Sequence, residues 1–124
     1  MPSTTTMTTR ETIEAYFNAL RQRQGMEDLL AEDMVFTSFT SPIRELQGRA
    51  AYLPGTKRFY DGIQSFELRE LMVDGDRAVA LTRYQIRGPG DRPPFSSDVA
   101  EVYRVREGKI VSFGIYFDTA PYPK

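Results

Sequence analysis

The segment that most constrains the fold runs from residue 98 to 118 and reads DVAEVYRVREGKIVSFGIYFD. Two runs rich in Val, Ile, Tyr and Phe are joined at Glu107-Gly108, a pair typical of the tight turn in an antiparallel hairpin. Because side chains alternate along a strand, one face of the first run carries Val99, Glu101, Tyr103 and Val105. A carboxylate on an apolar face is costly unless it is paired, neutralised or used. The hairpin therefore predicts a β-rich core and a candidate functional residue, Glu101.

The chain contains neither cysteine nor histidine. Without cysteine it has no disulfides, thiolate nucleophiles or Cys-ligated metals. Without histidine it has no Ser-His-Asp machinery, no His-ligated zinc and no imidazole base near neutral pH. Proton transfer must therefore use Asp, Glu, Tyr, Lys, Arg-assisted water or a base of the substrate. We expect no metal and no cofactor.

Composition and charge indicate an ordinary globular domain. A chain of 124 residues with 27% charged and 40% hydrophobic residues is long enough for one core. Its net charge of −1, with both signs interspersed, gives no footprint for nucleic acid or a membrane surface. No apolar run approaches the ~20 residues of a membrane span, and the Thr-rich start lacks the apolar segment of a signal peptide. A cytoplasmic location is expected by default.

The N-terminal part predicts helices. Thr8 followed by Glu11 forms a capping box, and it opens an apolar stripe at i, i+3, i+4 and i+7, made of Ile13, Tyr16, Phe17 and Leu20. Gly25 is expected to end this helix. Residues 26–31 predict a short second helix and residues 48–52 a third, which Pro54-Gly55 should break or kink.

The rest of the chain predicts strands. One strand is expected at residues 34–39, between the second and third helices. Asp74-Gly75-Asp76 is a hairpin turn between runs at 66–73 and 77–87, and the closing hairpin follows a Pro- and Gly-rich loop at 88–94. The prediction is an α+β domain over residues 9–118, with helices on a curved antiparallel sheet and tails at residues 1–8 and 119–124.

Several segments carry a resemblance to a known family: EAYFNAL (14–20), LLAEDMVF (29–36), LQGRAAY (46–52), VDGDRAVAL (73–81) and EVYRVREGKIVSFGIYFD (101–118). By these the chain resembles SnoaL-like proteins of the nuclear transport factor 2-like (NTF2-like) superfamily, which includes ketosteroid isomerases and limonene epoxide hydrolases. The resemblance covers residues 8–118. It implies a cone-shaped sheet with three N-terminal helices on its concave face. It does not select one activity, because this fold hosts isomerases, cyclases, hydrolases, dehydratases and binders.

Two mechanisms of the superfamily lose their carboxylates here. By resemblance to ketosteroid isomerases, Tyr16 matches the helix tyrosine and Glu101 the strand acid, but the base position falls near Ser38. A serine without histidine is a poor proton acceptor. By resemblance to limonene epoxide hydrolases, Arg83-Tyr84-Gln85 stands where Arg-x-Asp is expected, and Ile115 replaces the last-strand Asp. Both mechanisms are therefore disfavoured.

Two interpretations of Glu101 remain open. Paired with Arg83, it would stay ionised and its pKa would fall, whereas in a dry apolar pocket its pKa would rise and it could donate a proton. Arg83 and Gln85 share a strand face with Val79 and Leu81. If that face is concave, Arg83 can clamp an anionic oxygen; a register shift of one residue turns both outward.

Further candidates complete the expected site. Tyr16 is either a core aromatic or a hydrogen-bond donor to a ligand oxygen. The residues expected to line a substrate pocket are Phe36, Ser38, Gln85, Tyr103, Phe113, Ile115, Phe117 and Asp118. The Gly88-Pro89-Gly90 segment is expected to form a mobile flap near the pocket mouth.

The leading functional hypothesis is a cofactor-free acid/base enzyme, an isomerase, cyclase or dehydratase, acting on a small, mostly apolar, oxygenated molecule. Glu101 would transfer the proton or stabilise an oxyanion, Tyr16 would donate a hydrogen bond and Arg83 would hold an anion. The alternative is a non-catalytic small-molecule-binding or dimerisation module of the same fold. A homodimer through the sheet is expected because Tyr84 and Ile86 are apolar on the face opposite Arg83.

Overall fold

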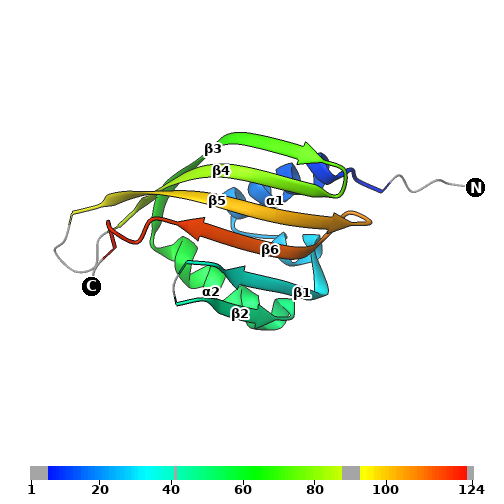
Figure 1. Ribbon diagram of the computed structural model, residues 1–124, viewed down its shortest axis with the longest axis horizontal. Helices are drawn as coiled ribbons and strands as arrows, with labels where there is room; N and C mark the ends of the chain where they lie inside the picture. Colours follow the sequence, from blue (N-terminus) through cyan, green and yellow to red (C-terminus); the bar gives the residue numbers. More distant parts are fainter. Residues whose placement is uncertain (1–5, 41, 88–92, 123–124) are drawn as a thin grey trace, which may run out of the picture.

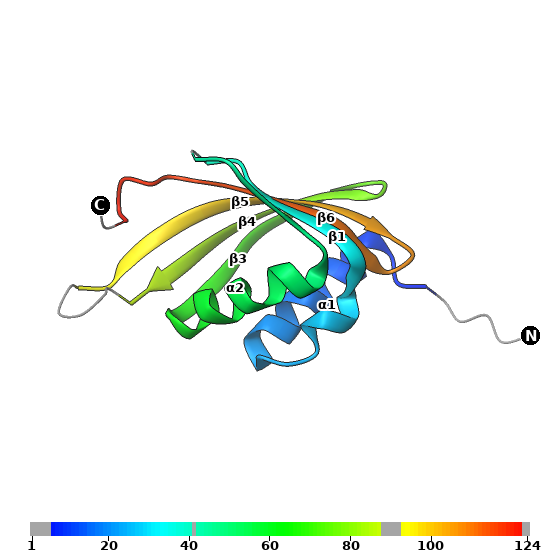
Figure 2. The same cartoon turned by 90° about the horizontal axis from the view of Figure 1, so that it is seen from below.

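The computed structural model describes residues 6–40, 42–87 and 93–122, which form a six-stranded sheet arched over two α-helices. Figure 1 shows the strands in the order β2-β1-β6-β5-β4-β3, and Figure 2 shows both helices on the concave side. The helical elements are α1 (Thr9–Gln22), the 3-10 turn η1 (Met26–Leu29) and α2 (Arg49–Asp61). The strands are β1 (Leu30–Ser38), β2 (Arg44–Gln47), β3 (Ile63–Asp74), β4 (Arg77–Ile86), β5 (Phe95–Arg106) and β6 (Lys109–Phe117).

The α+β architecture is confirmed, but the sheet is mixed. Strand β1 pairs in parallel with β6, with Phe36 opposite Phe113, while the other neighbouring pairs are antiparallel. The prediction of a wholly antiparallel sheet is therefore wrong at this pair. A parallel pair needs a long connection, and most of the chain lies between these two strands. The short edge strand β2 was not predicted.

Both predicted hairpin turns are confirmed. At the β5–β6 turn, Glu107 and Gly108 have φ of 50° and 73°, the left-handed pair that a type I′ turn requires. At the β3–β4 turn, Asp74 pairs with Arg77 around Gly75. Each turn sets the antiparallel pairing of its two strands, β3 with β4 and β5 with β6.

Helix α1 begins as predicted. Glu11 N donates to Thr8 Oγ1 at 3.1 Å, and Thr8 N donates to Glu11 Oε1 at 2.9 Å, so the capping box is complete. The whole predicted apolar stripe is buried. The helix end differs from the prediction. Arg23 takes the left-handed conformation (φ 59°), and Gly25 instead precedes the 3-10 turn η1.

The prediction of three helices is wrong within the described residues, which contain two α-helices and the single turn η1. Helix α2 also runs through Pro54 rather than breaking there. A proline inside a helix removes one N–H and crowds the carbonyl of the residue four positions earlier, Ala50. Helix α2 offsets this cost by burying Tyr52, Thr56 and Tyr60, which are spaced four residues apart.

The core lies between the concave face and the helices. Helix α1 contacts β4, β5 and β6, while α2 contacts β1 and β2. Neither α-helix in the described part of the chain combines the length and apolar character needed to cross a membrane. The flap expected around Gly88-Pro89-Gly90 lies outside the described residues.

Candidate functional site

A pocket of about 650 Å³ lies between the concave face of the sheet and α2. This volume falls within the range of small-molecule sites. Its wall is largely apolar, with Phe36 and Leu46 on one side, Phe59 on α2, and Phe113 and Ile115 on β6. Glu101 is the single carboxylate among the described residues that line it.

Glu101 is 2% exposed and accepts three hydrogen bonds from hydroxyl groups. Its Oε2 accepts from Thr82 Oγ1 at 2.6 Å and from Tyr84 OH at 2.8 Å, and its Oε1 accepts from Tyr103 OH at 3.0 Å. A carboxylate offers about four lone-pair positions, so this arrangement leaves about one for a ligand. The predicted strand face of Glu101 is confirmed, since Val99, Tyr103 and Val105 are buried beside it.

The register of β4 on β5 brings these donors together. Ala80 lies opposite Glu101 and Thr82 opposite Val99, so Thr82 and Tyr84 point to the same side as the carboxyl group. Tyr60 of α2 extends the network, with its hydroxyl 3.1 Å from that of Tyr84. Tyr84 gives its only hydroxyl proton to Glu101, so Tyr60 is the donor to Tyr84.

Burial raises the pKa of Glu101, while the hydrogen bonds from Thr82, Tyr84 and Tyr103 lower it. Burial prevails because the neutral acid is also well bonded. A protonated Oε2 can donate to Thr82 Oγ1, which then donates to the Val99 carbonyl at 3.2 Å. Since the neutral acid is satisfied too, the dry surroundings shift the equilibrium toward it and so raise the pKa of Glu101.

A second hydroxyl pair lies beside the first. The hydroxyls of Tyr16 and Tyr52 are 2.7 Å apart, and Tyr52 lines the pocket whereas Tyr16 does not. Burial raises the pKa of both phenols, which keeps them as neutral donors. If Tyr16 donates to Tyr52, the Tyr52 proton is free to point at a ligand.

The structure contradicts the inward placement of Arg83 and Gln85. Arg83 Nε and Nη2 donate to Asp98 at 2.7 and 3.0 Å on the outer face, and Gln85 Oε1 accepts from Ser96 Oγ at 2.9 Å. The pKa of Asp98 is lowered, first of all by its hydrogen bond from Arg83. The prediction assumed that Val79 and Leu81 mark the concave face of β4. The buried residues of β4 are instead Ala78, Ala80, Thr82 and Tyr84, so Arg83 and Gln85 point outward.

The same orientation of β4 overturns two further expectations, the Glu101–Arg83 ion pair and the outward placement of Tyr84. Glu101 forms no ion pair with Arg83, since the two side chains point to opposite faces of the sheet. Tyr84 is buried on the concave face, so it cannot be part of an outer docking surface. The reason given for a sheet-mediated homodimer is therefore wrong, although dimerisation itself is a separate prediction.

The predicted pocket residues separate into three groups. The pocket is lined by Phe36, Ser38, Phe113, Ile115 and Phe117. Tyr103 and Tyr16 lie behind it, joined to it through Glu101 and Tyr52. Asp118 is exposed, and its Oδ1 accepts from Ala120 N at 3.0 Å, so its predicted place in the pocket is wrong.

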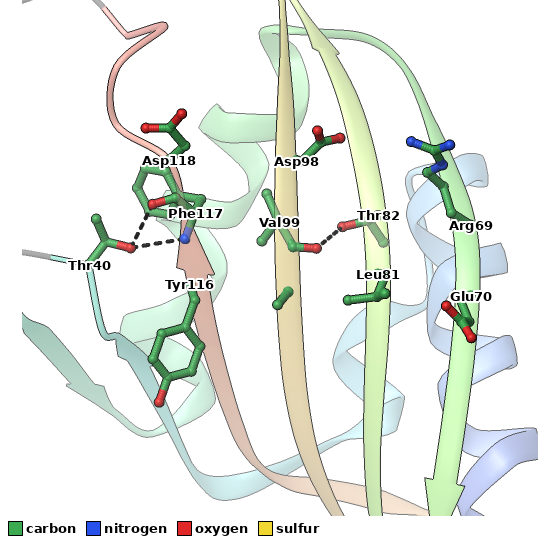
Figure 3. A pocket seen from close by; sticks show the side chains of 11 residues that line it. Thr40, Arg69, Glu70, Leu81, Thr82, Asp98, Val99, Tyr116, Phe117 and Asp118 are labelled. Carbon is green, nitrogen blue, oxygen red and sulfur yellow. Dashed lines mark hydrogen bonds between the residues drawn. The ribbon is translucent and has the colours of Figure 1, made fainter.

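A second hollow, on the outer face of the sheet, offers less for chemistry. Figure 3 shows Arg69, Asp98 and Asp118 among the side chains that line it, and all three are exposed. Asp98 is already paired with Arg83, and the charged side chains that line the hollow are exposed. The concave pocket, with its buried carboxyl group, is therefore the candidate site.

Sequence reasoning missed Thr82, Tyr84, Tyr60 and Tyr52 as site residues. A usable signal existed for α2, since Tyr52, Thr56 and Tyr60 recur every four residues once the helix is continued past Pro54. For β4, alternation defined two faces but not which was buried. Among the described residues no cluster of three or more Asp or Glu side chains could hold a metal ion.

Comparison with known proteins agrees with this geometry. A family model described as SnoaL-like domain matches residues 4–113. A search of curated protein sequences finds no match.

Solved structures show the same fold over nearly the whole chain. An NTF2-like protein from Burkholderia thailandensis superposes with a TM-score of 0.79 at 22% identity, over 91% of this chain and 92% of that one. A proposed isomerase from Rhodopseudomonas palustris gives 0.71 at 20% identity, over 92% of each chain. A proposed SnoaL-like polyketide cyclase from Shewanella putrefaciens gives 0.73 at 16% identity, over 95% of this chain and 81% of that one. These likenesses confirm the NTF2-like fold.

Proposed function

Because the chain belongs to the SnoaL-like family, we propose that its concave pocket binds a small, mostly apolar, oxygenated molecule and that Glu101 exchanges a proton with it. The observation that carries the proposal is a single buried carboxyl group, held by three hydroxyl donors, at the wall of an apolar pocket. The family includes cyclases and isomerases, and the neighbours from Rhodopseudomonas and Shewanella are described as a proposed isomerase and a proposed cyclase.

The network supports general acid–base chemistry by a carboxyl group. A raised pKa brings Glu101 closer to neutral pH, where an acid or base is most effective. As the acid, Glu101 would protonate a ligand oxygen; as the base, it would remove a proton from carbon next to a carbonyl. Thr82, Tyr84 and Tyr103 hold the carboxyl group in one orientation, and the Tyr60–Tyr84 link fixes one of these donors.

Tyr52 supplies the second function in this proposal. Tyr52 lines the same pocket, and its hydroxyl would donate to an oxygen that gains negative charge during proton transfer. One such donor in a site without water stabilises a transition state by about 3–4 kcal/mol. Tyr16, buried behind Tyr52, would orient that hydroxyl and not touch the ligand.

A non-catalytic binding module is the second candidate, and one observation favours it. Three of the lone-pair positions of Glu101 are already occupied by protein hydroxyls, which makes the carboxylate a weaker base. In that case Glu101 would serve to accept or donate one hydrogen bond to a bound ligand. The two candidates share the pocket and differ in whether a proton moves.

Proton exchange on carbon distinguishes them. The protein is incubated with 1-tetralone and 2-tetralone in D₂O, and loss of the α-proton signal is followed by ¹H NMR. We expect wild-type protein to accelerate exchange of at least one ketone above the buffer rate, and Glu101→Gln to remove the acceleration. Tyr52→Phe should reduce it, since the oxyanion donor is lost.

The control is Glu70→Gln, which removes an exposed carboxylate from the outer face. It should exchange at the wild-type rate. Exchange that persists in Glu101→Gln refutes the role of Glu101. Binding of the ketones without acceleration, detected as a thermal shift, would establish the binding module instead.

A further inference from the structure

The pocket wall carries two arginines where it meets solvent. Arg44 of β2 and Arg58 of α2 both line the pocket, and both are exposed. An exposed side chain that also lines a cavity lies at its mouth. Within the described part of the chain, neither arginine takes part in an ion pair.

The charges along the pocket are therefore arranged by depth. The same wall holds the buried carboxyl group of Glu101, apolar side chains such as Phe36 and Phe113, and the two exposed arginines. No acidic side chain among the described lining residues neutralises the mouth, because Glu101 is the only one and it is buried. A wholly apolar ligand would make use of neither guanidinium group.

We infer that the pocket selects an amphipathic anion: a molecule with an apolar body, an uncharged oxygen that reaches Glu101 and an anionic group, such as a carboxylate, that stays at the mouth between Arg44 and Arg58. This rests on the proposed function, because the inner oxygen is the one that exchanges a proton with Glu101. Arginine suits the outer role, since its planar guanidinium binds carboxylates with paired hydrogen bonds and is always charged. The anion would fix the ligand in one direction.

A matched pair of fluorescent probes tests the anion preference. 8-Anilinonaphthalene-1-sulfonate and N-phenyl-1-naphthylamine share one aromatic skeleton and differ by a sulfonate group. We expect wild-type protein to bind the sulfonate about tenfold more tightly, which corresponds to about 1.4 kcal/mol. Because the mouth is exposed, high salt should weaken binding of the sulfonate and leave the neutral probe unchanged.

Three variants locate the effect. R44Q/R58Q should lose the preference while keeping its affinity for the neutral probe. R77Q/R104Q removes two exposed positive charges from residues outside the pocket and should behave as wild type. Ala51→Trp, which places an indole at an exposed lining position, should weaken binding of both probes.

The inference is overturned if wild-type protein binds both probes equally, or if the two double variants lose the sulfonate preference equally. It is also overturned if R44Q/R58Q weakens binding of both probes equally, or if sulfonate binding persists in Ala51→Trp. The test does not involve turnover. An anion preference without ketone exchange would therefore remove the proposed function and the proton exchange at the inner oxygen, but keep the anion at the mouth. Exchange without an anion preference would remove only this inference.

Discussion

Replacing Glu101 by Gln should change how the stability of the fold depends on pH. Burial raises the pKa of Glu101 in the folded protein above that of an unfolded chain. At low pH the carboxyl group is protonated in both states. As pH rises through the ordinary carboxyl range, the unfolded chain releases its proton while the folded protein keeps it, so unfolding becomes easier.

The size of this effect follows from linkage. Between the two pKa values, one proton is released on unfolding, and the free energy of unfolding falls by about 1.4 kcal/mol per pH unit. The glutamine side chain of Glu101→Gln cannot ionise and has nearly the same shape. Its amide oxygen can still accept from Tyr103, while its NH₂ group donates to the hydroxyl of Thr82 or Tyr84. The variant should therefore match wild type at low pH and become the more stable protein as pH rises.

Urea denaturation from pH 4 to pH 8, followed by circular dichroism, measures this difference. Glu70→Gln, which removes an exposed carboxylate from the outer face, is the matched control. It keeps Glu101 and should follow the same pH dependence of stability as wild type. A stability difference that does not vary with pH would contradict the reasoning. A difference that grows in favour of wild type would show that the three hydroxyl donors outweigh burial and that Glu101 is ionised in the fold.

Two further predictions concern side chains that sequence reasoning placed wrongly. Tyr84→Phe deletes the hydroxyl that donates to Glu101 and should lower the free energy of unfolding by about 1–2 kcal/mol in urea denaturation. Its control is Tyr116→Phe, which changes a half-exposed ring and should not alter the free energy of unfolding measurably. An equal effect of the two changes would show that the buried network contributes nothing. Arg83→Gln should leave the denaturation midpoint and the ketone exchange rate close to wild type, because its ion pair with Asp98 is solvated and lies on the outer face; loss of exchange in this variant would place Arg83 back in the site.

Much of the local structure could be predicted because its causes lie within a few residues. The Thr8–Glu11 capping box, the buried stripe of α1 and the two hairpin turns each depend on neighbouring side chains and backbone conformation. The position of Glu101 among large apolar residues of β5 follows from the two-residue alternation of a strand. These features identified the residue around which the candidate site is built.

The hydrogen-bond partners of Glu101 depend on contacts between segments that are distant in sequence. Alternation gives β4 two faces but does not say which one is buried, and a shift of one residue exchanges Arg83 for Tyr84 in the pocket. Helix α2 continues past Pro54 because its tyrosines bury against the sheet, which local propensity does not include. The parallel pairing of β1 with β6 also joins segments far apart in sequence. The sequence by itself determined the turns, the first helix and a carboxylate on an apolar strand face. Only the tertiary structure decided that Glu101 is held by Thr82, Tyr84 and Tyr103, because strand register and helix packing select which side chains meet.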